Sequence, residues 1–380
     1  MVDHVDVMVI GIGDLGGWVV ELLARLPGIE HKKIIVASRN ENSGRKRAYS
    51  ASVGASFLGR GPYIEFVQLD LNDIDNTGQL LKKIQPKVIC NCATLQPWWI
   101  VNEIKPEIWS KIEAGAGFGP WGPIHLTLIY KLMQAITKYE IKSLVVNCCY
   151  PDLTNAVLWR SGFHCTCGIG NGDLLLPGIK MGVAKRLGIS ANNVFPYLIM
   201  HHSQVSQFMA NGIPGTPYFI KIMVADKDVT RQFDADQLIM DGINEWLPGQ
   251  HTHPITASST VKTIYHLLFD TGEISFAPGP NGEIGGYPVR MHGKGVDIVL
   301  PEGISVQKAR KLNENAQKKD GIEKIEADGN VVLTQQAHSV MQEFLGYDCK
   351  SFGIADVAER AQELLKRYDE LKKKFRRDNI

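Results

Sequence analysis

Short apolar runs recur through the first 150 positions, and longer stretches with helical spacing separate them. Short runs of this kind are typical of buried strands, and the longer stretches are typical of helices. The pattern predicts an α/β domain over residues 1–150, with a doubly wound parallel sheet. Strands are expected at 5–10, 33–37, 64–69, 88–92 and 144–147, and helices at 18–26 and 125–139.

The turn after the first apolar run carries three glycines in a GxGxxG pattern. Gly11 permits a tight turn, Gly13 lets the backbone approach a pyrophosphate, and Gly16 lets the helix pack close to the strand. Phosphates would face the N-terminus of that helix. The alternative is a glycine turn that binds nothing. Because the motif stands between a strand and a helix, we expect a Rossmann dinucleotide-binding domain. The motif consists of Gly11, Ile12, Gly13, Asp14, Leu15 and Gly16.

The end of the second strand bears on the choice of nucleotide. NAD-binding domains place an acidic residue there to hold the ribose 2′-hydroxyl, whereas this chain has Arg39. A cation favours a 2′-phosphate, so NADP is expected rather than NAD. Arg45, Lys46 and Arg47 either add to the same pocket or form a charged helix face. The other positions expected to contact the cofactor are Ser38, Asp70, Ala93 and Thr94; at Asp70 the expectation rests on resemblance to related nucleotide domains.

The loop after the fourth strand is expected to open over the nicotinamide end of the crevice. It carries Trp98 and Trp99, which either line a substrate pocket or belong to the core. The following segment, 114–123, holds four glycines and is consistent with a mobile lid or hinge, or with a plain flexible connection.

Composition excludes some partners. The chain has 44% hydrophobic and 21% charged residues and a formal net charge of +1, with no basic excess to attract nucleic acid. No apolar run reaches the roughly 18 residues of a membrane helix, so we expect a cytoplasmic protein with a small-molecule substrate. The seven cysteines suit reduced thiols better than disulfides. Cys165 and Cys167 supply at most half of a metal site, so no metal is expected.

From 143 to 205 the sequence resembles the lactate and malate dehydrogenase family in the order of its features. An apolar strand ends at Asn147, a glycine turn ends at Asp173, and a second strand ends at His202. The resemblance implies that Asn147 meets the substrate oxygen and that Asp173 and His202 form an acid-base pair. Hydride transfer to a carbonyl needs such a proton donor, and imidazole titrates near neutral pH. Alternatively, His202 is a core histidine and Asp173 caps the following helix.

The resemblance extends over about residues 5–317 and implies an α+β substrate domain at 151–319. A counterpart of the family's pocket-lining segment includes His253. Two departures concern the substrate: the arginine that the family carries three residues after its aspartate is Leu176 here, and the stretch 94–101 has none. Without a bidentate fork for a carboxylate, the expected substrate is a carbonyl, alcohol or imine other than a simple 2-hydroxy acid.

Residues 320–380 have no counterpart in that family and are expected to form a helical extension, with helices at 332–344 and 354–375. An apolar stripe on the last helix would pack on the parent domain or on a second subunit. We expect a homo-oligomer, either a dimer or a tetramer. Two alternative functions remain: an enzyme that resembles the NAD-dependent glycosidases, although their metal-binding cysteine is Gly170 or Asn171 here, and an inactive nucleotide sensor.

Overall fold

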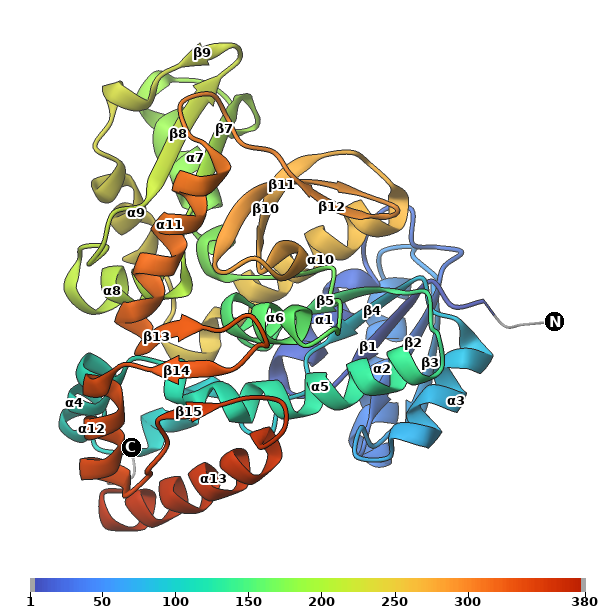
Figure 1. Cartoon of the computed structure of the whole chain (residues 1–380). Coiled ribbons are helices and arrows are strands. Elements are labelled where there is room, and N and C mark those ends of the chain that lie inside the picture. Colours follow the sequence, from blue (N-terminus) through green and yellow to red (C-terminus); the bar gives the residue numbers. More distant parts are fainter. Residues whose placement is uncertain (1–3, 377–380) are drawn as a thin grey trace.

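A computed structural model describes residues 4–376 of the chain. Residues 1–3 and 377–380 lie outside the described residues. The centre is a six-stranded parallel sheet with the strand order β3-β2-β1-β4-β5-β6 (Figure 1). This is the order of a Rossmann fold, so the predicted fold class is confirmed. The strands are β1 (Val7–Ile10), β2 (Lys33–Ser38), β3 (Tyr63–Gln68), β4 (Val88–Asn91), β5 (Leu144–Asn147) and β6 (Cys167–Gly168).

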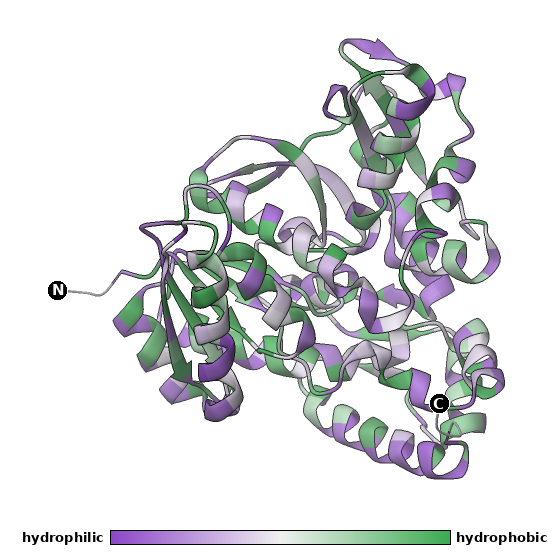
Figure 2. Ribbon diagram, turned by 180° about the vertical axis from the view of Figure 1, so that it is seen from behind, coloured by the Kyte–Doolittle hydropathy of each residue, from purple (hydrophilic) through white to green (hydrophobic). Residues whose placement is uncertain are grey.

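Both faces of the central strands are buried, which explains why these strands are largely apolar. In β1, Val7 and Val9 belong to one core cluster, and Met8 and Ile10 belong to another on the opposite face. Figure 2 shows the strands of this sheet in green, between helices that mix apolar and polar residues. One face is covered by α1 (Asp14–Leu23), α2 (Glu41–Ser56) and α10 (His253–Phe269), and the other by α3 (Ile74–Ile84), α5 (Gly122–Lys138) and α6 (Pro151–Arg160).

The second lobe contains two antiparallel three-stranded sheets, in agreement with the predicted α+β domain. An isolated bridge between Met200 and Gly286 joins them. Helix α10 begins at His253, where Pro254 suits the first turn of a helix. The lobe comprises α7 (Leu176–Leu187), β7 (Val194–Ile199), α8 (His202–Asn211), β8 (Phe219–Val224), β9 (Lys227–Asp228), α9 (Ala235–Ile243), β10 (Ile274–Pro278), β11 (Gly286–His292), β12 (Gly295–Ile298) and α11 (Val306–Ala316).

The C-terminal extension is not purely helical, which corrects the prediction. Besides two helices near the expected places it contains an antiparallel sheet of order β13-β14-β15. Val357, Leu364 and Tyr368 of the last helix are buried in the same core as Ile129 of α5, so the apolar stripe packs on the parent domain. The elements are β13 (Ile322–Ile325), β14 (Val331–Leu333), α12 (Gln335–Leu345), β15 (Ser351–Phe352) and α13 (Val357–Lys374), and Figure 1 shows them beside α4 (Pro106–Ala116) and α5.

The glycine-rich segment 114–123 is the surface on which this extension docks. A Cβ atom on Gly117 would stand 2.5 Å from the backbone of Asp320, and one on Gly122 would stand 2.5 Å from the ring of Phe352. Glycine is needed there because the two backbones approach so closely. The segment is therefore a packed contact and not a free lid. Across residues 4–376, every helix is too short or too polar to pass through a lipid bilayer.

Candidate functional site

A cavity of about 1100 Å³ lies between the carboxyl ends of the parallel strands and the second lobe. This is the crevice in which doubly wound sheets bind their ligands. At one end it is lined by the glycine turn and at the other by His202 and Asp320. The predicted cofactor and substrate positions that line it are Gly11, Gly13, Asp14, Leu15, Gly16, Ser38, Arg39, Asp70, Ala93, Thr94, Trp98, Trp99 and His253.

The glycine turn has the geometry that a pyrophosphate requires. Gly11 has φ +89°, and an added Cβ would meet the backbone of Ala93 at 2.5 Å. A Cβ on Gly16 would meet the carbonyl of Gly11, so helix and strand are in close contact there. At Gly13 an added Cβ would have no neighbour within 4 Å, and no side chain caps α1 there. The helix N-terminus is therefore open for a phosphate, and the residues present fit a dinucleotide.

Arg39 lies at the far edge of the cofactor end, directly after β2, and is exposed. Its backbone is fixed by Gln68, whose side-chain amide donates to the Arg39 carbonyl at 2.9 Å. Arg45 lies one turn into α2 and pairs with Glu41 at 2.8 Å. The cavity lining includes Arg39 but none of the three basic residues at 45–47, which favours a charged helix face for them.

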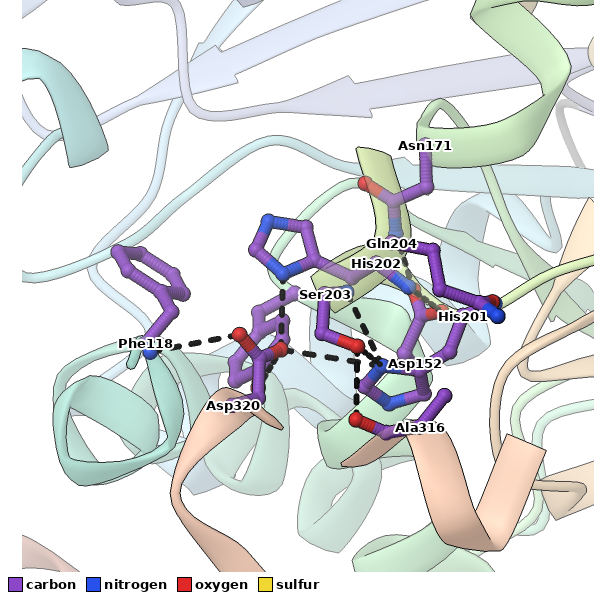
Figure 3. Close-up of polar contacts among 10 residues, drawn as sticks. Phe118, Asp152, Asn171, His201, His202, Ser203, Gln204, Ala316 and Asp320 are labelled. Carbon is purple, nitrogen blue, oxygen red and sulfur yellow. Dashed lines mark hydrogen bonds and ion pairs between the residues drawn. The ribbon is translucent and has the colours of Figure 1, made fainter. Parts of the chain in front are cut away.

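His202 forms a close pair with Asp320. Nδ1 of His202 lies 2.8 Å from Oδ2 of Asp320, and the same oxygen accepts a hydrogen bond from the hydroxyl of Tyr150 at 2.7 Å. The other carboxylate oxygen lies 3.4 Å from the backbone nitrogen of Phe118. Figure 3 shows the second ring nitrogen of His202 directed away from Asp320. A proton on Nδ1 therefore leaves Nε2 free for a ligand.

The charges of this pair stabilise each other. The His202 side chain is 22% exposed and that of Asp320 is 3% exposed. Burial by itself disfavours the charged imidazole, but the charge and hydrogen bond of Asp320 raise the pKa of His202 above its ordinary value. Burial likewise opposes ionisation of Asp320, yet His202 and the Tyr150 hydroxyl bring the pKa of Asp320 down to about 2. The carboxylate therefore stays ionised and holds the histidine in one tautomer.

The backbone around His202 is fixed by buried polar groups. Asp152, at the start of α6, accepts a hydrogen bond from the backbone amide of His202 at 3.0 Å. His201 is fully buried and caps α8, because its Nδ1 accepts from the amide of Ser203 at 3.1 Å. Gln204 completes a capping box by accepting from the amide of His201 at 2.8 Å. Of these two adjacent histidines, His201 thus caps the N-terminus of α8 and His202 faces the cavity (Figure 3).

Aromatic rings form the wall beside His202. The ring of Phe118 lies 5.5 Å from that of His202, and the ring of Tyr150 lies 5.2 Å from it, centroid to centroid. His125 of α5 lies 5.2 Å from Phe118, and burial lowers the pKa of His125 to about 3, so this imidazole is neutral. Its Nδ1 lies 3.3 Å from the hydroxyl of Thr94. Aromatic rings and a neutral imidazole therefore form one wall of this end of the cavity.

A second histidine joins the two lobes across the crevice. Nδ1 of His253 contacts the carboxylate of Asp14 in the glycine turn, and Nε2 lies 3.3 Å from the indole nitrogen of Trp98. Because an indole N–H only donates, Nε2 of His253 is the acceptor and Nδ1 carries the proton. The sequence placed Asp14 with the cofactor and the other two residues with the substrate. The structure brings all three together at the cavity wall.

Asp173 does not pair with His202, which corrects the expectation taken from the dehydrogenases. The Asp173 carboxylate is bound by the ammonium of Lys262 at 2.5 Å and by the hydroxyl of Ser259, both on α10. It does not cap the following helix either, because α7 begins without a side-chain cap. The cation and hydroxyl of α10 hold this carboxylate in the wall of a separate pocket, together with Leu176.

Asn147 is also placed differently from the expectation. It is fully buried, and its amide nitrogen donates to Thr154 and Asn155, both at 2.9 Å. Its carbonyl accepts from the backbone of Cys149 at 3.1 Å and from Asn91 at 3.3 Å. With every polar atom engaged inside the protein, Asn147 has none left for a substrate.

The residue that replaces Asp173 as partner of His202 was not foreseen from the sequence. Asp320 follows two lysines at the end of a short helical turn, where the family resemblance ends. An acidic residue in such a stretch is normally solvated, and only the fold shows that Asp320 is buried. Among the described residues that line the cavity, the lysine and arginine side chains are those of Arg39 and Lys319, so the end near His202 has no guanidinium fork.

Comparisons with known proteins agree with this geometry. Residues 7–95 match the family model described as saccharopine dehydrogenase NADP binding domain, which identifies this segment as a nicotinamide-nucleotide-binding domain. A sequence search of curated proteins gave no significant match.

Solved structures similar to most of this chain include dehydrogenases of low sequence identity. A lactate dehydrogenase from a Medee basin deep-sea metagenome library is 14% identical with a TM-score of 0.59; the match covers 83% of this chain and 97% of that one. For the malate dehydrogenase of Picrophilus torridus the identity is 16%, the TM-score 0.58 and the coverages 83% and 96%. The lactate dehydrogenase of Cryptosporidium parvum, solved with lactic acid and nicotinamide adenine dinucleotide, is 15% identical with a TM-score of 0.57. That match covers 84% of this chain and 98% of the other. The chain therefore has the lactate and malate dehydrogenase fold, with a nucleotide-binding segment similar to that of saccharopine dehydrogenases.

Proposed function

We propose that this protein is an NADP(H)-dependent oxidoreductase that interconverts a carbonyl or imine with the corresponding alcohol or amine, with His202 as the acid-base group. The observation that carries the proposal is the pair of His202 and Asp320, joined at 2.8 Å and placed in the same cavity as the glycine turn. Asp320 takes the orienting role that the resemblance assigned to Asp173.

In the direction of reduction, Nε2 of protonated His202 donates a proton to the substrate oxygen or nitrogen. Asp320 holds Nδ1 and stabilises the imidazolium, which raises the pKa of His202 and favours the protonated form that donates. A bound nicotinamide supplies or accepts the hydride. In the opposite direction His202 takes the proton from the alcohol or amine.

The lining of the cavity supports a substrate other than a small 2-hydroxy acid. Phe118 and Tyr150 contribute rings beside His202, and His125 is neutral. Lys319 is a point charge and lacks the planar fork that binds a carboxylate in two places. NADP is preferred over NAD because Arg39 stands at the position where the ribose 2′-group would lie.

The test is a fluorescence titration of the purified protein with NADPH and with NADH, followed by a panel of aromatic and aliphatic ketones and imines. We expect preferential binding of NADPH, and oxidation of NADPH that depends on one of the compounds and is abolished in His202→Ala. His31→Ala, an exposed histidine outside the cavity lining, is the matched control and should retain activity. Failure of both nucleotides to bind contradicts the proposal, and tight binding without turnover of any compound favours a nucleotide sensor.

A further inference from the structure

Three cysteines meet at the carboxyl end of the two central strands. Cys90 lies within β4, Cys92 follows that strand, and Cys148 follows β5. Side chains two apart in a strand point to the same face, and Asn91 and Asn147 are paired in the β4-β5 register. The fold therefore places all three thiols on the face covered by α1 and α10.

Their sulphur atoms form a compact triangle. Sγ of Cys90 lies 3.7 Å from Sγ of Cys92 and 3.7 Å from Sγ of Cys148, and the last two sulphurs are 3.5 Å apart. A tetrahedral zinc ion with Zn–S bonds of about 2.3 Å places its sulphur ligands about 3.8 Å apart. The triangle matches one face of that tetrahedron to within a few tenths of an ångström. Among residues 4–376, this is the one group of three potential metal ligands with such close atoms.

The N-terminus of helix α1 lies beside this triangle. Cys92 lies against the first turn of α1. A Cβ atom added to Gly16 in that turn would stand 3.4 Å from the Cβ of Cys92. The N-terminus of a helix stabilises a nearby negative charge.

We infer that Cys90, Cys92 and Cys148 form a binding site for one thiophilic metal ion, with Zn²⁺ as the ion that fits its geometry. Binding releases the thiol protons to solvent, and three Zn–S bonds form. Cys92 and Cys148 line the cavity, whereas Cys90 is fully buried. The fourth coordination position therefore faces the crevice, an arrangement with three protein ligands that is typical of reactive rather than purely structural zinc sites. This inference does not rest on the oxidoreductase proposal, although Cys92 and Cys148 line the cavity in which the nucleotide is proposed to bind. It revises the expectation that the chain holds no metal.

The experiment measures zinc on the full-length protein without any assay of activity. Reduced protein is dialysed against buffered Zn²⁺ and its metal content is determined by mass spectrometry. We expect about one zinc per chain, and an affinity at least about tenfold lower in Cys92→Ser and in Cys148→Ser, since changes beyond the direct ligands already cost that much. Cys165→Ser is the matched control, a buried cysteine packed on the other face of the sheet, and should bind zinc like the wild type.

Two further measurements keep the test decisive if a variant folds poorly. Co²⁺ in place of Zn²⁺ should give a thiolate charge-transfer band in the wild-type protein. Bound Zn²⁺ should also protect Cys92 and Cys148 from alkylation, as read by peptide mass spectrometry. Absence of stoichiometric zinc from the folded wild type, or equal zinc binding in the serine variants, overturns the proposal and leaves the triangle as apolar packing.

Discussion

Nδ1 of His202 lies 2.8 Å from Oδ2 of Asp320, although 118 positions separate the two residues in the chain. The imidazole, the hydroxyl of Tyr150 and the backbone of Phe118 converge on that carboxylate, and Nδ1 of His201 lies 3.9 Å from the same oxygen. Because this geometry determines the charge on His202, it can be tested before any substrate is known.

Asp320→Asn should lower the pKa of His202, because the amide keeps the shape of the side chain but removes its charge. In the folded wild type the pKa of His202 is raised above 6.5, its value in the unfolded chain. The pairing therefore stabilises the fold fully at pH values below 6.5, and this stabilisation is lost as the pH rises through the pKa of the folded state. The stabilisation that comes from ionised Asp320 is present above pH 3.8, the pKa of an unperturbed aspartate, and is lost as the pH falls through its folded pKa of about 2. Histidine NMR titration measures the shift, with the His202 signal assigned by its loss in His202→Ala. An unchanged titration in Asp320→Asn contradicts the pairing.

Arg39→Ala should weaken NADPH binding by about tenfold or more while NADH binding changes little, because a charged hydrogen bond contributes about 1.5 to 3 kcal/mol. Parallel fluorescence titrations with the two nucleotides measure this ratio. Arg45→Ala is the control, since Arg45 pairs with Glu41 and lies outside the cavity lining. Equal losses for NADPH and NADH would show that Arg39 does not read the 2′-phosphate.

Lys262→Met should destabilise the fold by about 1 to 3 kcal/mol, because it leaves the carboxylate of Asp173 buried without its cation. Nucleotide affinity should not change, since neither residue lines the main cavity. Urea denaturation gives the free energy of unfolding, and adding Asp173→Asn should restore part of it. A variant with normal stability and impaired nucleotide binding would return Asp173 to the active site.

Tyr150→Phe should lower the free energy of unfolding by about 1 to 2 kcal/mol, because Asp320 loses one hydrogen-bond donor. It should also raise the pKa of Asp320 towards its ordinary value. A carboxyl with a depressed pKa loses its stabilising share as the pH falls through that pKa, so acid unfolding should begin at a higher pH in the variant. Tyr130→Phe, whose ring packs on Phe163, is the control. Identical acid-unfolding curves for Tyr150→Phe and the wild type would contradict the role of this hydroxyl.

The part of the site that the sequence predicts best is the glycine turn. Its requirements are local: Gly11, Gly13 and Gly16 act through the backbone of one strand, one turn and one helix, so their spacing and the flanking strand and helix identify them. The same holds for the apolar strands, because a strand buried on both faces has a continuous run of apolar residues that is visible in the sequence. The extension shows the limit, since its strands are two to four residues long and have no periodicity to detect.

Roles that depend on distant partners were not predictable in this way. Asp173 and Asn147 have the residue types of a catalytic site, but Lys262 on α10 and Asn155 on α6 engage them. Asp320 lacks any local signal, and its burial arises only when the extension docks on the glycines at 117–122. The homo-oligomer stays a prediction.

The position of Asp320 118 residues after His202 has a consequence for the order of biosynthesis. A ribosome completes the Rossmann domain and exposes His202 before it adds the carboxylate, and the core that buries Asp320 also needs β13, α12 and α13. Domains fold in sequence as they emerge. The nascent chain can therefore acquire a folded nucleotide-binding half early, while the pair of His202 and Asp320 is assembled only after the residues up to α13 have been added.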